Sequence, residues 1–300
     1  MLRPYQASDL NALTRFIGEC WKRDKFTNYH PGDFVHWMSN GYRGERLEHH
    51  FQIVEEAEQI LAVVHLDAKS GMYAPVIDTH RRGGPWELAF HRACIAVMRE
   101  RMKGSDKKTL IVNFVLGDKA GKDCIEQLGF KGEKSDYVQL VRSLDSIPDT
   151  PPEAQLPEGF SIRSVAREHE AQRLADVHDG AFGPKWSEAK YRKVMQTEGY
   201  DAERELVVVA PGGRFAAFLI IWFDPISRSG LFEPVGCHSE FRRRGLTKTL
   251  MYAGMARMKE AGMVSANVGC QSEIACKFYA SVGFETYFET VDYVLELKNN

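Results

Sequence analysis

The sequence has no long apolar segment and no surplus of basic residues. Its first ten residues, MLRPYQASDL, contain no apolar h-region, so we expect no secretory signal and a cytoplasmic protein. The longest apolar run, residues 215–223, is about half as long as a membrane span requires, which predicts a buried strand and no membrane association. The net charge of −2 argues against nucleic acid as a partner.

Cysteine is also sparse, with six residues and no C-x-x-C motif. Each cysteine lies beside apolar residues in the sequence, as buried thiols do in proteins of a reducing cytoplasm. We therefore expect no metal site, and free thiols at Cys20, Cys94, Cys124, Cys237, Cys270 and Cys276.

The length of 300 residues, with 44% apolar and 27% charged residues, fits a globular protein of two domains of about 150 residues each. The segment SLDSIPDTPPEAQLPEG, residues 143–159, has four prolines among acidic and small residues, which favours an extended linker. We therefore predict a first domain at residues 1–145, a linker at 146–159 and a second domain at 160–300.

The two predicted domains repeat one order of elements. Each opens with a short strand and a helix, continues with strands, and reaches an arginine-glycine stretch followed by an amphipathic helix. Each then has a β-branched strand, a helix and a Gly-Phe pair, at 129–130 and 283–284, where glycine ends the helix. Strands and helices mix without strict βαβ alternation. This predicts an α/β (mixed α+β) fold of two tandem domains, each a mixed, mostly antiparallel twisted sheet flanked by helices.

The stretch SEFRRRGLTKTL, residues 239–250, has the features of an anion site. A strand is expected to end here in a glycine turn that opens a helix, whose first N–H groups and dipole favour a negative charge. Gly245 would let a ligand approach the backbone, and Arg242, Arg243 and Arg244 add donors suited to phosphate. The alternative is that the arginines form a solvated surface run.

This stretch resembles the acyl-CoA pyrophosphate loop of the GNAT N-acetyltransferase superfamily, R/Q-x-x-G-x-G/A, with Thr247 in place of the final small residue. The resemblance is specific over residues 232–284 and covers both halves in outline, as in tandem GNAT proteins. It implies acetyl-CoA as cosubstrate, with the strand edge receiving the pantetheine arm through backbone groups. The cofactor-binding residues that it implies are Val235, Cys237, His238, Arg242, Arg243, Arg244, Gly245, Leu246, Thr247 and Ser272, the last in place of the family's frequent asparagine.

The resemblance also implies the chemistry, which is direct transfer of the acetyl group of acetyl-CoA to a primary amine. Glu233, on the strand that leads to the loop, is the candidate base for the proton of the amine. Tyr279, four residues before Gly283, matches the family's tyrosine acid, which protonates the leaving thiolate. Structural alternatives remain: Glu233 also fits an edge-strand residue, Tyr279 a residue at the core margin, and His238 a structural histidine.

The acceptor is expected to be a small-molecule or peptide amine, which the sequence does not identify. Aromatic residues that could form its pocket, or equally be ordinary core, are Phe182, Trp186, Tyr191 and Trp222. Two other interpretations stay open, a non-catalytic acyl-CoA-binding regulatory protein with this fold and a structural or interaction protein. The sequence predicts no oligomeric state.

The first half carries an altered copy of the loop, His80-x-x-Gly83-x-Pro85. A mostly neutral histidine replaces the leading arginine, and Pro85 lacks a backbone N–H. The shared Gly-Phe register places Ile125 where the second half has Tyr279. We therefore expect a degenerate GNAT-like first domain, with transfer confined to the second.

Overall fold

The computed structural model describes residues 2–24, 26–37, 49–147, 156–166, 168–196 and 199–297. Most of the predicted linker, residues 148–155, lies outside these ranges. In the described ranges no helix combines the length and apolar character needed to cross a membrane.

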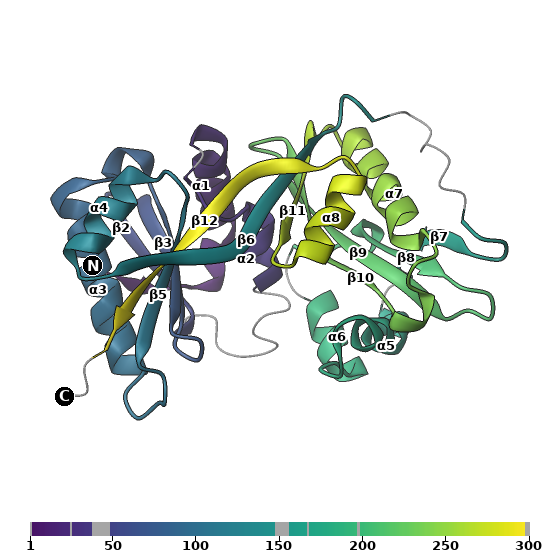
Figure 1. Cartoon of the computed structure of the whole chain (residues 1–300), viewed down its shortest axis with the longest axis horizontal. Coiled ribbons are helices and arrows are strands. Elements are labelled where there is room, and N and C mark those ends of the chain that lie inside the picture. The colour runs from purple at the N-terminus through teal and green to yellow at the C-terminus, as the bar shows by residue number, and fades with distance from the viewer. Residues whose placement is uncertain are drawn as a thin grey trace.

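Twelve strands of the described chain form one sheet, in the order β1-β2-β3-β4-β5-β12-β6-β11-β10-β9-β8-β7 (Figure 1). Neighbouring strands run antiparallel except for β4 with β5 and β10 with β11, which are parallel. Helices flank this sheet. The predicted fold class, a mixed and mostly antiparallel sheet with helices on its faces, is confirmed.

The elements follow the predicted order in both halves. Those of the first half are β1 (Arg3–Pro4), α1 (Leu10–Arg23), α2 (Pro31–His36), β2 (Phe51–Glu56), β3 (Gln59–Asp67), β4 (Met72–Ile77), α3 (Gly84–Arg101), β5 (Thr109–Val115), α4 (Lys119–Gln127) and β6 (Lys131–Ser143). Those of the second are β7 (Ser161–Ser164), α5 (Ala171–Phe182), α6 (Glu188–Met195), β8 (Glu205–Val209), β9 (Phe215–Asp224), β10 (Ser229–Cys237), α7 (Leu246–Glu260), β11 (Ser265–Cys270), α8 (Glu273–Ser281) and β12 (Glu285–Glu296).

The two halves exchange their last strands. β6, which closes the first half in sequence, pairs with β11 of the second half, whereas β12 at the end of the chain pairs with β5 of the first half. β6 and β12 also pair with each other, and they run side by side between the two lobes (Figure 1). The sheet is therefore continuous, and each half is completed by a strand of the other.

Helices cover both faces of β9, because this strand is apolar on both sides. The apolar run predicted as a buried strand is β9, in which Phe218 packs against α5 while Leu219 packs against α7 on the opposite face. A further core joins the two halves: Phe34 of α2 belongs to one apolar cluster with Ile220 and Trp222 of β9. Helix α2 of the first half thus lies on the sheet of the second.

The internal duplication is visible where α4 and α8 end. Gly129 and Gly283 have φ angles of +89° and +85°, the left-handed conformation in which glycine ends a helix. The phenylalanine after each glycine donates its N–H to a carbonyl five residues earlier, that of Ile125 at 3.3 Å and that of Tyr279 at 3.1 Å. Ile125 and Tyr279 therefore occupy equivalent positions, in the predicted register.

Two of the six cysteines are not free thiols, and the prediction was wrong for them. Cys270, the last residue of β11, and Cys276 in α8 form a disulfide. The turn between β11 and α8 reverses the chain and brings their Cα atoms to 5.7 Å, a separation that a disulfide can bridge. The remaining cysteines are free, with Cys20, Cys94 and Cys124 buried and Cys237 partly buried.

Candidate active site

The parallel strands β10 and β11 pair only at their beginnings. Residues 229–231 of β10 are in register with residues 265–267 of β11, and no later pair joins the two strands in the described chain. β10 continues to Cys237 while it stays paired with β9 on its other side. The strands therefore diverge and leave one edge of β10 open, where an extended ligand arm can pair with backbone groups.

The divergence coincides with an irregularity in β10. The register with β9 shifts between Phe232 and Val235, as it does at a β-bulge, which bends a strand. Residues 229–232 are buried, whereas the next three, beginning with Glu233, are partly exposed. The indole Nε1 of Trp222 donates to the Glu233 carbonyl at 2.5 Å. A hydrogen bond from Trp222 of β9 therefore stabilises the bend. The bend places Glu233 where β10 and β11 diverge, which we call the opening.

Helix α7 begins directly after the arginine-rich turn. Gly245 is its N-cap with φ at +76°, and an added Cβ would meet no atom within 4 Å. This backbone conformation favours glycine, and the open space lets a ligand approach the backbone. The first N–H groups of an α-helix have no partner in a preceding turn and form its positive end. Leu246 and Thr247 present such groups, so the turn has the geometry of an anion site.

The three arginines of the turn differ in their contacts. Arg242 donates from Nε to the carbonyl of Cys237 at 3.3 Å and from Nη2 to the carbonyl of Ala181 at 2.8 Å. Arg244 donates to a carbonyl of the preceding short 3-10 helix at 3.3 Å. Arg243 is exposed, with φ at +65°. Arg242 therefore ties the end of β10 to α5, while Arg243 and Arg244 face solvent beside the start of α7.

Two other predicted residues hold the local fold. Nδ1 of His238 accepts the N–H of Glu240 at 3.3 Å, and its ring packs so close to Gly180 that a Cβ there would overlap it. Ser272 caps α8, because its Oγ accepts the N–H of Ala275 at 3.2 Å. Both side chains are engaged within the protein, so their contribution to a ligand would come through the backbone they position.

Val235 and Cys237 lie on the open part of β10 and pack against the core under α7. Burial raises the pKa of the Cys237 thiol, while a hydrogen bond with Thr247 opposes the shift. A protonated thiol is a poor nucleophile, so the site does not favour a covalent step through Cys237.

Glu233 lies at the opening between β10 and β11, and Tyr279 is a buried residue of the core cluster that also contains Phe232 of β10. Burial, and then the negative charge of Glu233, raise the pKa of the Tyr279 phenol. Burial and the nearby Asp33 carboxyl raise the pKa of Glu233 to about 8, although 33% of its side chain remains exposed. The candidate pair therefore consists of a protonated phenol in the core and a carboxyl that titrates near neutrality at the opening.

Residues of the first half also reach this opening. Nε2 of His36, at the end of α2, is 3.6 Å from Oε1 of Glu233. Burial, and then the charges of Asp33 and Glu233, raise the pKa of Tyr137 on β6. Sequence analysis missed His36, Asp33 and Tyr137, because only the placement of α2 and the exchange of β6 bring them to the second half.

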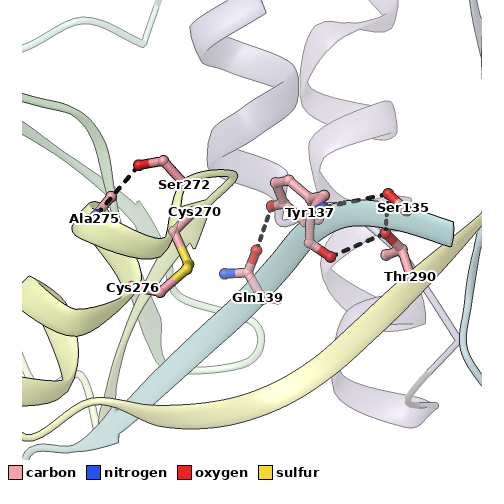
Figure 2. Close-up of a disulfide and its surroundings, with 8 residues drawn as sticks. All are labelled: Ser135, Tyr137, Gln139, Cys270, Ser272, Ala275, Cys276 and Thr290. Carbon is pink, nitrogen blue, oxygen red and sulfur yellow. Dashed lines mark hydrogen bonds between the residues drawn. A yellow bond between two sulfur atoms is a disulfide. The ribbon is translucent and has the colours of Figure 1, made fainter.

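Tyr137 and Gln139 project from the same side of β6, beside the disulfide (Figure 2). The Tyr137 hydroxyl donates to Oε1 of Gln139 at 2.5 Å. It also covers Gly269 of β11, where an added Cβ would lie 2.7 Å from that hydroxyl. Since the disulfide joins the end of β11 to α8, it fixes the helix that carries Tyr279 next to this pair.

The first half has the same strand geometry with different side chains. β4 and β5 are parallel and pair only at residues 72–73 of β4. The sequence Tyr-Ala-Pro-Val at 73–76 corresponds to Phe-Glu-Pro-Val at 232–235, so Ala74 stands where the second half has Glu233. With Ile125 in the place of Tyr279, neither candidate catalytic side chain has a counterpart.

A carboxylate of the protein occupies the anion-binding turn of the first half. The N–H of Gly83 donates to the carboxylate of Glu87. Nε of Arg82 contacts the same carboxylate at 3.1 Å, and its Nη2 contacts Asp118. The exposed fraction of the side chain is 12% for Arg82, 0% for Glu87 and 2% for Asp118. Glu87 therefore uses the donors that a phosphate would need.

The aromatic residues predicted for the acceptor pocket are mostly elsewhere. Tyr191 is fully buried and donates its hydroxyl to Glu205, and Trp186 packs in the same cluster under α5 and α6. Phe182, at the end of α5, is largely exposed. Of the four, Trp222 is the one bonded to β10 at the opening.

The predicted site residues are separate from a surface hollow of the described chain. A wide surface hollow of about 1400 Å³ lies at the far end of α7, and it contains none of the predicted site residues. The described ranges also contain no group of three or more His, Cys, Asp or Glu side chains that could hold a metal ion.

Two parallel strands thus diverge and leave an open strand edge that leads to an arginine-rich helix start. Residues 171–284 match the family model described as the acetyltransferase (GNAT) family. Over these residues the chain is therefore similar to the GNAT family, and the resemblance seen in the sequence is confirmed. No curated protein matches the sequence.

Solved structures extend the likeness of fold to the whole chain. A GCN5-related N-acetyltransferase from Sphaerobacter thermophilus has a TM-score of 0.66 at 16% identity, over 100% of this chain and 96% of its own. A tandem GNAT protein from the clavulanic acid biosynthesis pathway has a TM-score of 0.66 at 15% identity, over 100% and 99%. N-myristoyltransferase from Saccharomyces cerevisiae, solved with bound myristoyl-CoA, has a TM-score of 0.58 at 12% identity, over 100% and 79%. At these identities the likeness concerns the fold alone, which both halves share.

Proposed function

We propose that the second half transfers the acetyl group of acetyl-CoA to a primary amine by direct attack, in the cytoplasm. The family match supports the coarser reaction, acyl transfer from an acyl-CoA. The observation that carries the finer proposal is the pair of Glu233 at the opening between β10 and β11 and Tyr279 in the adjoining core. A phenol and a carboxyl supply the two proton transfers that direct attack on a thioester requires.

The Glu233 carboxylate accepts the proton of the acceptor amine. An alkylammonium has a pKa near 10.4 and an ordinary glutamate near 4.3, so proton transfer between them costs about 8 kcal/mol. With the pKa of Glu233 at about 8, that cost falls to about 3 kcal/mol. The environment of Glu233 therefore suits a base that works near neutral pH.

Tyr279 serves as the acid. Because burial and Glu233 raise the pKa of its phenol, Oη keeps its proton throughout the neutral range. Tyr279 donates this proton to the sulfur as the carbon–sulfur bond breaks and the carbon–nitrogen bond forms. Glu233 then holds the proton taken from the ammonium. The second proton, which the nitrogen loses as the amide forms, goes to the Tyr279 phenolate and restores the phenol, and Glu233 returns its proton to solvent, so the protons balance.

The cosubstrate fits the geometry of the turn and the strand. Acetyl-CoA supplies an acetyl group that is activated as a thioester. The N–H groups of Leu246 and Thr247, with Arg243 and Arg244, would hold its pyrophosphate in the space left by Gly245. The open backbone edge at Val235 and Cys237 would pair with the pantetheine arm, and Arg242, His238 and Ser272 would support these elements.

The first half is assigned no transfer in this proposal. It lacks both catalytic side chains, since Ala74 and Ile125 stand in their places. Its anion-binding turn is satisfied by Glu87, a charge that would repel a phosphate. Its contribution is instead structural, through β6 and α2.

The test is product formation with acetyl-CoA and a panel of small and peptide amines, followed by mass spectrometry. Wild type should acetylate at least one amine, and Tyr279→Phe and Glu233→Gln should each slow that reaction while acetyl-CoA still binds. Binding of acetyl-CoA by calorimetry with no product from any amine would favour the alternative, a non-catalytic acyl-CoA-binding protein.

A further inference from the structure

We propose that α2 of the first half forms one wall of the acceptor site, where His36 positions the Glu233 carboxyl and acidic surroundings select an amine without a neighbouring acidic group. This inference rests on the proposed function, because it concerns the base of that reaction. It gives the first half a role in substrate selection.

Helix α2 is fixed against the second half by specific contacts. Nε2 of His30, its N-cap, is 2.8 Å from Oγ of Ser229 at the start of β10. An added Cβ at Gly32 would lie 2.5 Å from Cβ of Trp222, so the helix packs against β9 at a distance that only glycine allows. The pairing of His30 and Ser229 is completely buried. The position of α2 over β9 and β10 is therefore built into the fold.

This placement sets His36 beside Glu233. Nε2 of His36 is 3.6 Å from Oε1 of Glu233, and the His36 ring lies edge-on to Trp222 at a centroid distance of 6.2 Å. Trp222 in turn bonds the backbone carbonyl of Glu233. Trp222 of β9 therefore binds the backbone of Glu233, and His36 of α2 lies next to its carboxyl. His36 is a positioning residue, since it acts through Glu233 and not on the reacting atoms.

The groups that face Glu233 come from three elements packed around it. They are Asp33 and His36 of α2, Tyr137 of β6 and Tyr279 of α8. This set contains carboxyls, phenols and one imidazole, and neither Lys nor Arg. Burial raises the pKa of Asp33 to about 7 and burial and Asp33 raise that of Glu233 to about 8, so above these values two carboxylates in mutual range attract an ammonium group and repel a carboxylate. The acceptor that suits this wall is a cationic amine with no acidic group next to it.

The first experiment follows Glu233 directly and does not depend on turnover. The side-chain carbons of 13C-labelled glutamate are titrated by NMR in the full-length protein, with Glu233→Gln used to assign the Glu233 signal. Asp33→Asn should lower the pKa of Glu233, because it removes the neighbouring charge. His36→Ala should raise it, because the carboxylate loses a donor. An unchanged titration in both variants would overturn the proposal even if the enzyme is active.

The second experiment measures transfer. His36→Ala should lower kcat about 10–100-fold through misplacement of the base, with KM for acetyl-CoA unchanged. His36→Gln, which restores an N–H donor, should recover most of the loss. His169→Ala, at an exposed histidine of the second half, is the matched control and should behave as wild type. Thermal unfolding checks that each variant is folded, and equal kcat for His36→Ala and wild type would contradict the assignment.

The third experiment tests selection with matched amines, such as tyramine against tyrosine and histamine against histidine. The amine without a carboxylate should have at least a tenfold higher kcat/KM, and Asp33→Asn should reduce that ratio. A best acceptor that carries a carboxylate beside its amine would overturn the selection. If wild type acetylates no amine while the titration shifts as expected, the proposed function fails and the coupling of α2 to Glu233 stands.

Discussion

Ile125 and Tyr279 occupy the same position in the two halves, each at the carbonyl that receives the N–H of the phenylalanine starting the last strand. One is an aliphatic side chain in the core of the first half, and the other is a phenol in the core of the second half, in one cluster with Phe232 of β10. The two halves therefore share one backbone position, which carries a phenol in the second half and no proton-donating group in the first.

Tyr279→Phe should lower kcat about 10²–10⁴-fold, because the departing thiolate loses its proton donor. The affinity for acetyl-CoA should change little, since the phenol is not among the groups proposed to hold the pyrophosphate. Steady-state kinetics and calorimetry separate the two quantities. Tyr293→Phe, at a buried tyrosine of the first-half core, is the control. Normal turnover with reduced thermal stability would support a role at the core margin instead.

Arg244→Ala should weaken acetyl-CoA binding by about 1–3 kcal/mol, the cost of a lost charge-assisted hydrogen bond. Calorimetry should also give one acetyl-CoA per chain. The control in the first half is Arg81→Ala, an exposed residue that pairs with Glu56. Arg82 is unsuitable, because its removal would leave the buried Glu87 and Asp118 without their partner. Two equivalent sites per chain would show that the first half also binds.

The wild-type kcat/KM should rise with pH and level off above about pH 8, because Glu233 must lose its proton to act as a base. In Glu233→Gln this limb should disappear and the remaining rate should be low. The pH profile is measured at saturating acetyl-CoA with a fixed acceptor. A limb that persists in Glu233→Gln would assign it to another group.

The stability of the second half should depend on Glu205. Burial raises its pKa to about 7, against an ordinary value of 4.5, while Tyr191 and Tyr200 donate to it. Its contribution is present in full below pH 4.5 and is lost as pH rises through 7. Between pH 5 and pH 8, wild type should lose about 2 kcal/mol more unfolding free energy than Glu205→Gln, as measured by urea denaturation.

Reduction of the disulfide should lower the free energy of unfolding by about 2 kcal/mol, the entropy that a loop of this size removes from the unfolded chain. The Cys270→Ser/Cys276→Ser variant should show the lower stability in both oxidising and reducing buffer. Urea denaturation with and without a thiol reductant measures the difference. Equal stability of oxidised and reduced wild type would mean that the bond does not form in the protein.

The glycine turn before α7 and the position of Tyr279 relative to Gly283 were predictable from sequence because their signals are local. Gly245 sits at a helix start with a positive φ angle, and Gly283 fixes the register that identifies Tyr279. The hydrogen bonds of Arg242 to the carbonyls of Cys237 and Ala181 were not predictable, because a run of three arginines does not indicate which one contacts the protein and which ones face solvent.

The exchange of β6 and β12 was beyond a reading of the sequence. Alternation of apolar and polar residues indicates a strand and its buried face, but it does not name the neighbouring strand. Both strands follow a Gly-Phe pair, so each fits either half equally well. The proximity of His36 and Tyr137 to Glu233 could not be predicted for the same reason, because it depends on contacts between segments that are distant in sequence.

The exchange of strands also sets an order of events during synthesis. The edge of β5, which ends at Val115, is covered in the finished protein by β12, which ends at Glu296. At about 5–20 residues per second, a ribosome needs roughly 10–35 s to make the intervening chain. During that interval β6 is the one of the two central strands that has already emerged. The nascent first half can therefore complete its sheet only after β12 has been synthesised.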